Sequence, residues 1–193
     1  MIILSNDCSH SYFYKLNNVQ YNHPLFWTLF LHDDYISFVK NYDNINWLNY
    51  NIYLDKPINK TSYECKGHYY MNIDNKFNCE FPHYTDESIG LGEYLYDAMV
   101  PDAKKYIEYK YLSRLKRFNK KDKTIFLYNQ KKDDTINDVL EFINLDIPYQ
   151  KIVYTNFKLL TIYNSSKVKV IYSNDIDFIK SSISFAMELK HYF

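Results

Sequence analysis

The chain is short of glycine, with 3 among 193 residues, and it carries no net charge at pH 7. The glycine patterns of phosphate loops, dinucleotide-binding turns and serine-hydrolase elbows do not occur in the sequence. This argues against ATP-dependent, NAD-dependent and serine-hydrolase chemistry. The 23 basic and 23 acidic residues balance, so no extended footprint for nucleic acid is expected.

Cysteine and long apolar runs are scarce as well. The 3 cysteines are an odd number and make no disulfide framework, which favours a reducing compartment. No apolar run approaches the roughly 20 residues of a membrane span, and the amino terminus lacks the regions of a signal peptide. We therefore expect a cytoplasmic protein with neither membrane nor nucleic acid as a partner.

What the chain has in excess is tyrosine, with 22 residues, together with abundant Asn, Lys and Ile. All four have AT-rich codons. The excess therefore indicates a strongly AT-biased genome, such as that of a large DNA virus or of some bacteria and protists, rather than a tyrosine-dependent function.

Apolar periodicity predicts strands that alternate with helices. Strands are expected at 1–4, 68–73, 76–81, 123–128, 152–154, 159–163 and 168–172. Helices are expected at 8–17, 101–119 and 135–145, with others capped by Asp33-Asp34 and by Asp175. Residues 45–54 suggest a strand or an irregular buried segment, Asp74-Asn75 a hairpin turn, and 85–92 a loop.

This alternation predicts an α/β fold, in which a layered, largely parallel sheet is flanked by helices and carries an inserted hairpin. We expect residues 1–193 to form a single catalytic domain, either alone or as one module of a longer chain.

The most informative segment is Ser5-Asn6-Asp7-Cys8-Ser9-His10, which follows the first predicted strand. Ser, Asn and Asp favour a turn and cap a helix, because their side chains accept hydrogen bonds from nearby backbone N–H groups. A cysteine at such an elbow lies near free amides and a helix dipole, which favour the thiolate and can hold an oxyanion. Cys8 therefore suits a nucleophile, whereas the structural alternative is a small buried hydrophobe.

A thiolate nucleophile usually works with a histidine base. His83 is the best of the 6 histidines, because Phe81-Pro82-His83-Tyr84 places it after a predicted strand and before a glycine-containing loop. Asp86 or Glu87 can orient its imidazole, and a structural histidine is an equal alternative. His10 is a poor direct partner for a cysteine two residues away, and we expect it to contact substrate.

A zinc site is the weaker interpretation of the cysteines and histidines. Cys65 with His68 and Cys79 with His83 have spacings that together mimic a zinc set. Structural zinc sites normally use tighter paired spacings, so we expect no metal.

Basic residues follow one another along the predicted helix 101–119. Such a run is usually a solvated face. Arg114 and Arg117 lie one turn apart, however, and they can clamp a phosphate if that face borders a cleft.

Four segments together resemble the bacterial papain-like cysteine peptidase and exopolysaccharide-biosynthesis protein families. Ile3-Leu4-Ser5-Asn6-Asp7-Cys8 resembles their Asn-x-Cys opening, and Pro24-Leu25-Phe26-Trp27 is similar to their Pro-Phe-Asp-Trp block, with Phe26 replacing the acid. Phe81-Pro82-His83 matches their Phe-Pro-His element. Residues 110–118 and 123–127 resemble their Lys-Tyr-x-Arg-Arg helix and the following strand. The opening also resembles, more distantly, that of capsule-polysaccharide acetyltransferases that bind coenzyme A.

The ordered spacing of these segments implies that Cys8 and His83 form a catalytic dyad. Related proteins act in surface-polysaccharide synthesis, which implies acyl transfer to a sugar. We therefore expect an acetyl-coenzyme A-dependent acetyltransferase, acting on the amine of a nucleotide-linked amino sugar and fused to or acting with other sugar-modifying enzymes. A sugar N-acetyltransferase domain of a large virus, acting in the host cytoplasm, fits this expectation. The alternatives are a cysteine hydrolase with the same dyad and a non-catalytic interaction module.

The remaining site residues are expected to bind substrate. Asn6, Ser9 and His10 would line the pocket, and Trp27 would stack on a sugar face. Lys110 or Arg114 would meet a phosphate of the donor or acceptor, and Asp86 would lie beside the base.

Overall fold

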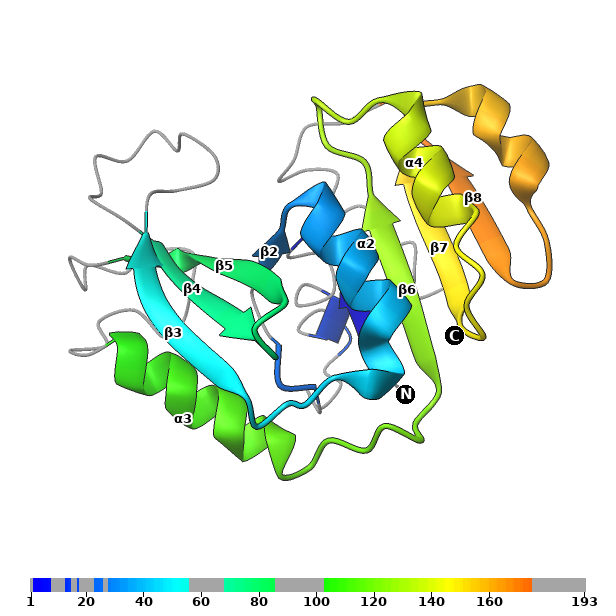
Figure 1. The fold of residues 1–193 in the computed structure, drawn as a ribbon. Helices are drawn as coiled ribbons and strands as arrows, with labels where there is room; N and C mark the ends of the chain where they lie inside the picture. Colours follow the sequence, from blue (N-terminus) through cyan, green and yellow to red (C-terminus); the bar gives the residue numbers. More distant parts are fainter. Residues whose placement is uncertain are drawn as a thin grey trace. The chain divides into compact units, whose positions relative to one another are not determined.

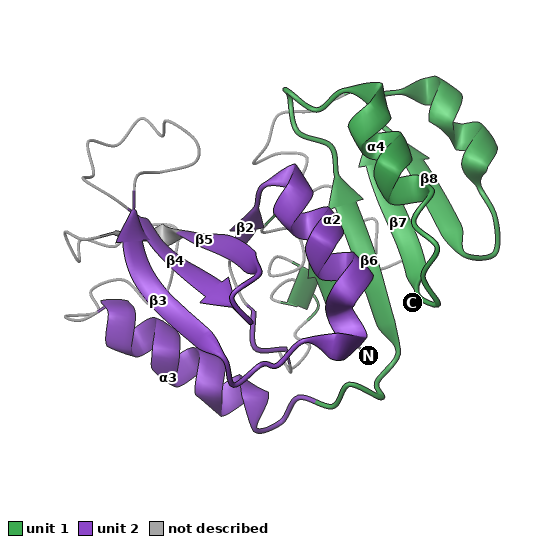
Figure 2. Ribbon diagram, viewed as in Figure 1, with its two compact units in different colours: residues 1–21, 119–193 green, residues 22–118 purple. Residues whose placement is uncertain are grey.

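The computed structural model describes residues 2–7, 13–14, 17, 23–25, 28–55, 68–85 and 103–174, without the side chains of 82–85. This part of the chain has an α/β fold with one parallel and one antiparallel four-stranded sheet (Figure 1). It divides into two compact units, residues 1–21 with 119–193 and residues 22–118 (Figure 2). The predicted fold class is confirmed, and the antiparallel part is larger than the inserted hairpin expected from the sequence.

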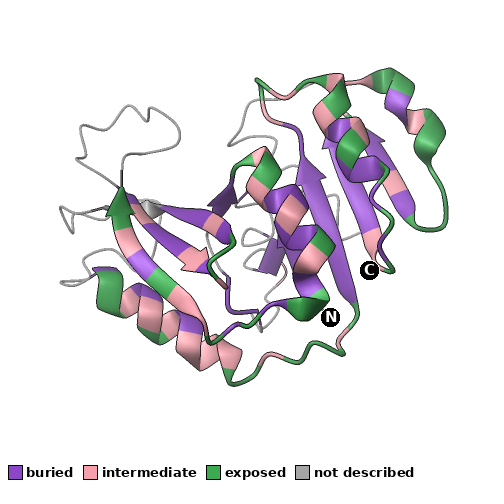
Figure 3. Ribbon diagram, in the orientation of Figure 1, coloured by how far each residue is buried: buried purple, intermediate pink, exposed green. Residues whose placement is uncertain are grey.

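The parallel sheet belongs to the unit of residues 1–21 and 119–193. Its strands run in the order β1 (Ile2–Ser5), β6 (Thr124–Asn129), β7 (Gln150–Thr155) and β8 (Val168–Tyr172). All neighbouring pairs are parallel, with Ile3 opposite Ile125 and Leu127 opposite Ile152. Every residue of β6 is buried (Figure 3), as expected for a parallel strand that is covered on both faces.

Apolar side chains from the four strands, together with Phe13 and Tyr14 from the helical residues after β1, form a cluster on one face of this sheet. Its members are Ile3, Phe13, Tyr14, Ile125, Leu127, Ile152, Tyr154 and Ile171. The opposite face packs on α4 (Ile136–Ile143), whose Phe142 ring lies 5.1 Å from the ring of Tyr128. Strand residues alternate between these two faces, which explains why nearly every position must be apolar.

Side chains cap both ends of α4 by hydrogen bonds to its terminal backbone groups. At its start, the hydroxyl of the N-cap Thr135 and the carboxylate of Asp138 form a reciprocal capping box. At its end, the ammonium of Lys151 donates to the carbonyls of Ile143 and, at 2.7 Å, Leu145. Lys151 is buried within β7, and this burial lowers its pKa to about 8.

The predicted strand at 159–163 is wrong, because these residues form a 3₁₀ helix, η2 (Lys158–Tyr163). Residues three apart lie on one face of such a helix. Leu159 and Ile162 accordingly share an exposed face, whereas Leu160 is buried. Local side-chain bonds favour the tight turn over a strand, including Thr161 Oγ1 to the Lys158 carbonyl at 2.9 Å.

The antiparallel sheet belongs to residues 22–118. Its strands run in the order β2 (Leu29–Phe30), β5 (Phe77–Thr85), β4 (His68–Ile73) and β3 (Tyr50–Asp55). Each neighbouring pair is antiparallel. Of the segment 45–54, only its second half is therefore a strand.

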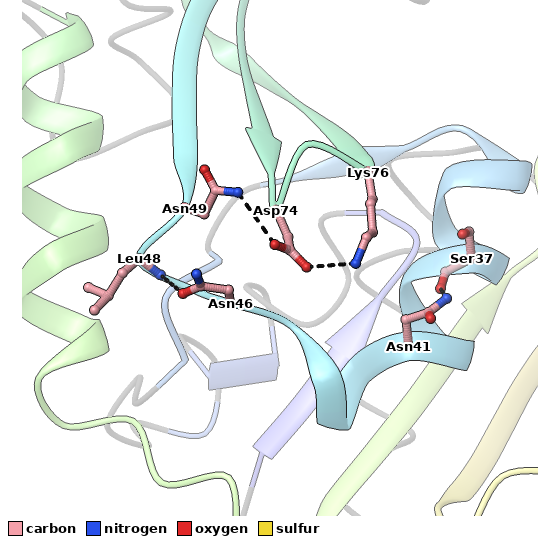
Figure 4. A network of polar contacts seen from close by, with 7 residues as sticks. All are labelled: Ser37, Asn41, Asn46, Leu48, Asn49, Asp74 and Lys76. Atoms are coloured by element: carbon pink, nitrogen blue, oxygen red, sulfur yellow. Dashed lines mark hydrogen bonds and ion pairs between the residues drawn. The ribbon is translucent and has the colours of Figure 1, made fainter.

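The hairpin predicted at Asp74-Asn75 is confirmed. Both residues have positive φ, 56° and 55°, which suits a two-residue turn between twisted strands and which Asp and Asn tolerate. The Asp74 carboxylate accepts a hydrogen bond from the Asn49 amide at 3.4 Å and pairs with the Lys76 ammonium at 3.0 Å (Figure 4). The turn is thereby attached to the start of β3.

An aromatic cluster around Phe38 forms the core of this unit. Phe38 belongs to α2 (His32–Asn41), which continues into a short 3₁₀ helix, η1 (Tyr42–Asn44). Five aromatic rings lie with their centroids 5.1–6.4 Å from the Phe38 ring, those of Phe30, Tyr35, Tyr42, Trp47 and Phe77. α3 (Ala103–Leu115) joins this core through Tyr111, whose hydroxyl donates to the Trp47 carbonyl at 2.7 Å.

Two helix boundaries differ from the predicted ones. α2 begins before the expected cap, so Asp33 and Asp34 lie in its first turn, and the Asp34 carboxylate accepts from the Asn78 amide at 3.0 Å. α3 ends at Leu115 rather than near residue 119. Of the predicted helix 8–17, Phe13 and Tyr14 are helical, and the Asn17 amide donates to the Phe13 carbonyl at 3.1 Å. The predicted loop beyond Thr85 and the last predicted helix lie outside the described residues.

Candidate functional site

Asn6 joins the carboxyl ends of β1 and β6. Its side-chain Nδ2 donates to the Asn129 carbonyl at 2.9 Å, and its Oδ1 accepts from the Asn129 amide at 2.8 Å. The residue is 1% exposed. These two hydrogen bonds extend the ladder of the two strands by one step beyond the pairing of Ser5 with Leu127. Asn6 therefore fixes the direction in which the backbone leaves β1.

Asp7 is fully buried at the same edge. One carboxylate oxygen accepts from the Ser5 hydroxyl at 2.7 Å, and the other accepts from the Asn129 side-chain amide at 2.6 Å. A buried carboxylate is costly unless its oxygens are hydrogen-bonded, so these contacts constrain the position of Asp7. The residue that precedes Cys8 is thus held by side chains from both strands.

The polar contacts continue to β7, the next strand of the sheet. The Gln130 side-chain oxygen accepts from the Thr155 hydroxyl and, at 2.9 Å, from the Asn156 amide. We call the buried residues that join these three strand ends the polar edge: Ser5, Asn6, Asp7, Asn129, Gln130 and Thr155. Ligands of α/β proteins bind outside the carboxyl ends of parallel strands, and the polar edge is therefore the candidate site of this unit.

The predicted nucleophile Cys8 is the next residue along the chain after the polar edge, and it lies outside the described residues, as do Ser9 and His10. Further along the chain, the Tyr14 hydroxyl accepts a hydrogen bond from the Ile3 amide at 2.9 Å. Burial raises the pKa of Tyr14 to about 12, which keeps its hydroxyl neutral. The segment that contains Cys8 is thus attached to β1 on both sides, at Asp7 and at Tyr14.

The sequence predicts that Asn6 lines the substrate pocket, and in the structure its side-chain amide is hydrogen-bonded to the Asn129 backbone. Sequence reasoning placed Asp7 in the turn but missed its partner Asn129, and it missed Gln130. A signal for the last two was present, because Asn129 and Gln130 directly follow the apolar strand predicted at 123–128.

In the unit of residues 22–118, β5 bulges opposite the start of β4. His68 is paired with Thr85, whereas the next residue, Tyr69, is paired with Phe81. The three residues Pro82, His83 and Tyr84 therefore lie between consecutive pairs of the ladder. Proline lacks the N–H that a ladder needs, so Pro82 favours such a bulge.

This bulge corrects the predicted place of His83. The histidine lies within β5 rather than after it. Bulges are frequent beside active sites, which is compatible with the predicted role of His83 but also with a structural one. Asp86 and Trp27 lie outside the described residues.

A buried histidine–carboxylate pair flanks the bulge. His68 and Glu80 are 2% and 1% exposed, and Nδ1 of His68 is hydrogen-bonded to Oε1 of Glu80. Which atom donates in this hydrogen bond depends on the tautomer of the imidazole. Oε2 of Glu80 is buried, and within the described part of the chain it has no hydrogen-bond partner. Sequence reasoning missed the pair, because Glu80 alternates with Cys79 and Phe81 and so falls on the face that the pattern predicts to be polar.

Lys110 and Arg114 lie one turn apart on α3 and therefore share one side of that helix. The Lys110 ammonium lies 5.0 Å from the centroid of the Tyr106 ring. Both residues are half-buried. Arg117, the other half of the predicted phosphate clamp, lies beyond the end of α3, and its backbone amide donates to the Arg114 carbonyl at 2.9 Å. Binding of phosphate by these residues stays a prediction.

Cys79 provides a contrast to the predicted nucleophile. It is buried in β5, where its thiol lies 3.7 Å from the Met71 carbonyl. Burial raises the pKa of this thiol far above its usual range, so it stays protonated and unreactive.

Over the described ranges, no group of three or more His, Cys, Asp and Glu residues is placed to hold a metal ion. Nor is any helix in these ranges long and apolar enough to cross a bilayer.

Neither the protein-family models nor the curated proteins that were compared with the chain match it. The resemblance of its four segments to polysaccharide-biosynthesis families therefore stays a prediction from the sequence.

Proposed function

We propose that the chain is an acetyl-coenzyme A-dependent acetyltransferase that uses Cys8 to modify a nucleotide-linked amino sugar. The observation that carries this proposal is the polar edge. Asn6 and Asp7 are buried and hydrogen-bonded to β6, so the backbone just before Cys8 has a fixed position at the carboxyl edge of a parallel sheet. A nucleophile needs such a rigid support to reach its substrate in a productive orientation.

In the proposed reaction the Cys8 thiolate attacks the carbonyl carbon of the acetyl thioester and forms a new C–S bond. The bond to the coenzyme A sulfur then breaks, and coenzyme A leaves as a thiol after it takes the proton that the base had accepted from the Cys8 thiol. The acceptor amine attacks the acetyl-cysteine, the C–S bond to Cys8 breaks, and the amine gives its proton to the base, which the sequence predicts to be His83. The thiolate is regenerated, and no oxidant or reductant is needed.

The identity of the donor and acceptor is supported by the sequence resemblance. The remaining predicted residues have roles that follow from their chemistry: backbone amides near Ser9 for the oxyanion, Trp27 for a sugar face, and Lys110 and Arg114 for phosphate. Arginine and lysine suit this last role because phosphates of coenzyme A and of nucleotide sugars are anionic.

The proposal is tested by mass spectrometry of the intact chain after incubation with acetyl-coenzyme A. We expect an acetyl adduct on the wild type that is absent from Cys8→Ser and is discharged by an added amino-sugar nucleotide. Cys79→Ser is the matched control, because it removes a thiol that burial keeps protonated. It should therefore keep the adduct.

An adduct that persists in Cys8→Ser would overturn the assignment of the nucleophile. Absence of any adduct, together with absence of coenzyme A binding by calorimetry, would overturn the transferase. A Cys8-dependent release of acid from ester or amide substrates would then identify the cysteine hydrolase.

A further inference from the structure

We propose that His68 and Glu80 are positioning residues that hold the bulge of β5 and thereby set the geometry of His83. The inference rests on the proposed function only for the chemical role of His83. Its effect on the bulge is independent of that role and is tested separately.

The first argument is the placement of the pair. Along β5, Glu80 is paired with Tyr70 and precedes Phe81, the last paired residue before the bulge, and Thr85 comes just after the bulge, where it is paired with His68. The side-chain bond from His68 to Glu80 therefore runs across the interruption in the ladder. It connects the two points between which Pro82, His83 and Tyr84 are inserted.

The second argument is the environment of the bond. Both side chains are almost fully buried, so the bond is shielded from water and its directional preference is strong. The carboxylate also has an oxygen, Oε2, without a hydrogen-bond partner in the described ranges, which makes its burial costly. Apolar residues of similar volume often serve stability as well as a buried ion pair or better. The pair is therefore better explained by the geometry it imposes than by stability alone.

The third argument is the contrast with the rest of the hairpin. Away from the bulge, β4 and β5 keep a regular register from Tyr69–Phe81 to Ile73–Phe77. They are also joined there by the Asn72 amide, which donates to the Asn78 side-chain oxygen at 2.8 Å. Beyond the bulge, the described ladder continues only with the pair of His68 and Thr85. The side-chain bond is thus placed where the backbone contributes least.

The test compares the imidazole signals of the histidines by NMR, with the His83 signal assigned through its loss in His83→Gln. Glu80→Ala removes the bond, whereas Glu80→Gln keeps a hydrogen-bonding partner for His68 Nδ1. The double variant His68→Leu with Glu80→Leu removes the bond but fills the space with apolar groups. Asn72→Ala is the matched control, because it removes a side-chain bond between the same strands away from the bulge.

We expect the His83 signal to move or broaden in Glu80→Ala and in the leucine variant, and to stay in place in Asn72→Ala. Glu80→Gln should return the signal to the wild-type position. In the acetyl-transfer assay, Glu80→Ala should lower kcat by up to about 100-fold with little change in KM, as a displaced catalytic group does. Glu80→Gln should recover most of this loss.

An unchanged His83 signal in the folded leucine variant would overturn the inference. Failure of that variant to fold would overturn it too, because the pair would then serve the sheet as a whole. If the chain forms no acetyl adduct, the proposed function fails, and the NMR comparison still decides whether the pair positions the bulge.

Discussion

The parallel and the antiparallel sheet keep their polar side chains in different places. In the parallel sheet, β6 is buried along its whole length, and the polar groups gather where β1, β6 and β7 end. In the antiparallel sheet, polar residues lie within the strands, as in the bond from Asn72 to Asn78 and the pair of His68 and Glu80. A parallel sheet that is covered on both faces leaves only its ends for polar groups, whereas an antiparallel sheet can carry them on one face.

This difference affects how each unit can hold a functional residue. The polar edge fixes the backbone where it leaves β1, as far as Asp7. The antiparallel sheet holds its candidate residue within a strand, and a bulge provides the departure from regular pairing. Four predictions test this comparison.

The largest effect is expected in the aromatic cluster of the antiparallel unit. Phe38→Ala should lower the free energy of unfolding by about 3–5 kcal/mol, because it leaves a cavity among rings that cannot collapse to fill it. Urea unfolding measures the loss, and native-state hydrogen exchange should assign it to residues 22–118. Leu48→Ala is the control, since its side chain is 75% exposed. A loss below about 1 kcal/mol for Phe38→Ala would contradict the central place of this ring.

Sequence periodicity was enough to predict most strands of both sheets, although it missed β2 and left β3 open between a strand and an irregular segment. The strand at 123–128, the helix at 135–145 and the hairpin at Asp74-Asn75 all occur near their predicted places. The prediction failed at 159–163, where four apolar or aromatic residues and Thr161 belong to a 3₁₀ helix. A run this short contains too little periodicity to separate a strand from a tight helix, and local hydrogen bonds of Thr161 and Asn164 decide.

The candidate site was predictable only where a residue acts through its neighbours in sequence. The turn chemistry of Ser5 and Asp7 could be inferred, because their bond spans two residues. The partnership of Asn6 with Asn129 could not, since 123 residues separate them and only the sheet order brings them together. The pair of His68 and Glu80 could not be predicted either. It depends on the shift in strand register at the bulge, and the periodic pattern of the sequence does not predict such a shift.

The second effect concerns the polar edge. Asn6→Leu should lower the free energy of unfolding by about 2–4 kcal/mol, because it removes two buried bonds and leaves the Asn129 backbone groups without them. Urea unfolding measures this loss. Asn137→Leu is the matched control, since the same substitution there affects an exposed position on α4. In the acetyl-adduct assay, Asn6→Leu should also slow labelling of Cys8. Unchanged stability and labelling would show that the polar edge does not fix the backbone.

The third effect concerns Lys151, which stabilises the end of α4 from within the parallel sheet. Lys151→Met should cost about 1–2 kcal/mol, because the bonds to the Ile143 and Leu145 carbonyls are lost while apolar packing is kept. The folded pKa of about 8 lies below the ordinary 10.5. Between these values the unfolded chain binds more protons, so the contribution of Lys151 to stability rises with pH. Urea unfolding over this interval should show a smaller rise in Lys151→Met, and equal slopes would contradict the assignment.

The smallest effect brings the comparison back to the antiparallel unit, where tyrosine hydroxyls are buried beside the aromatic cluster. Tyr111→Phe should cost about 1 kcal/mol, because the Trp47 carbonyl loses its donor at 2.7 Å. Burial raises the pKa of Tyr111 above the ordinary 10.0, so its contribution to stability is present below about pH 10 and is lost as the unfolded chain ionises at higher pH. The variant should therefore lose stability less steeply in alkali than the wild type. Tyr109→Phe, at a position that is 67% exposed, is the control and should leave both the free energy of unfolding and its alkaline slope unchanged. If the two variants behave alike, the Tyr111 hydroxyl does not tie α3 to the core, and the aromatic rings alone account for the packing of this unit.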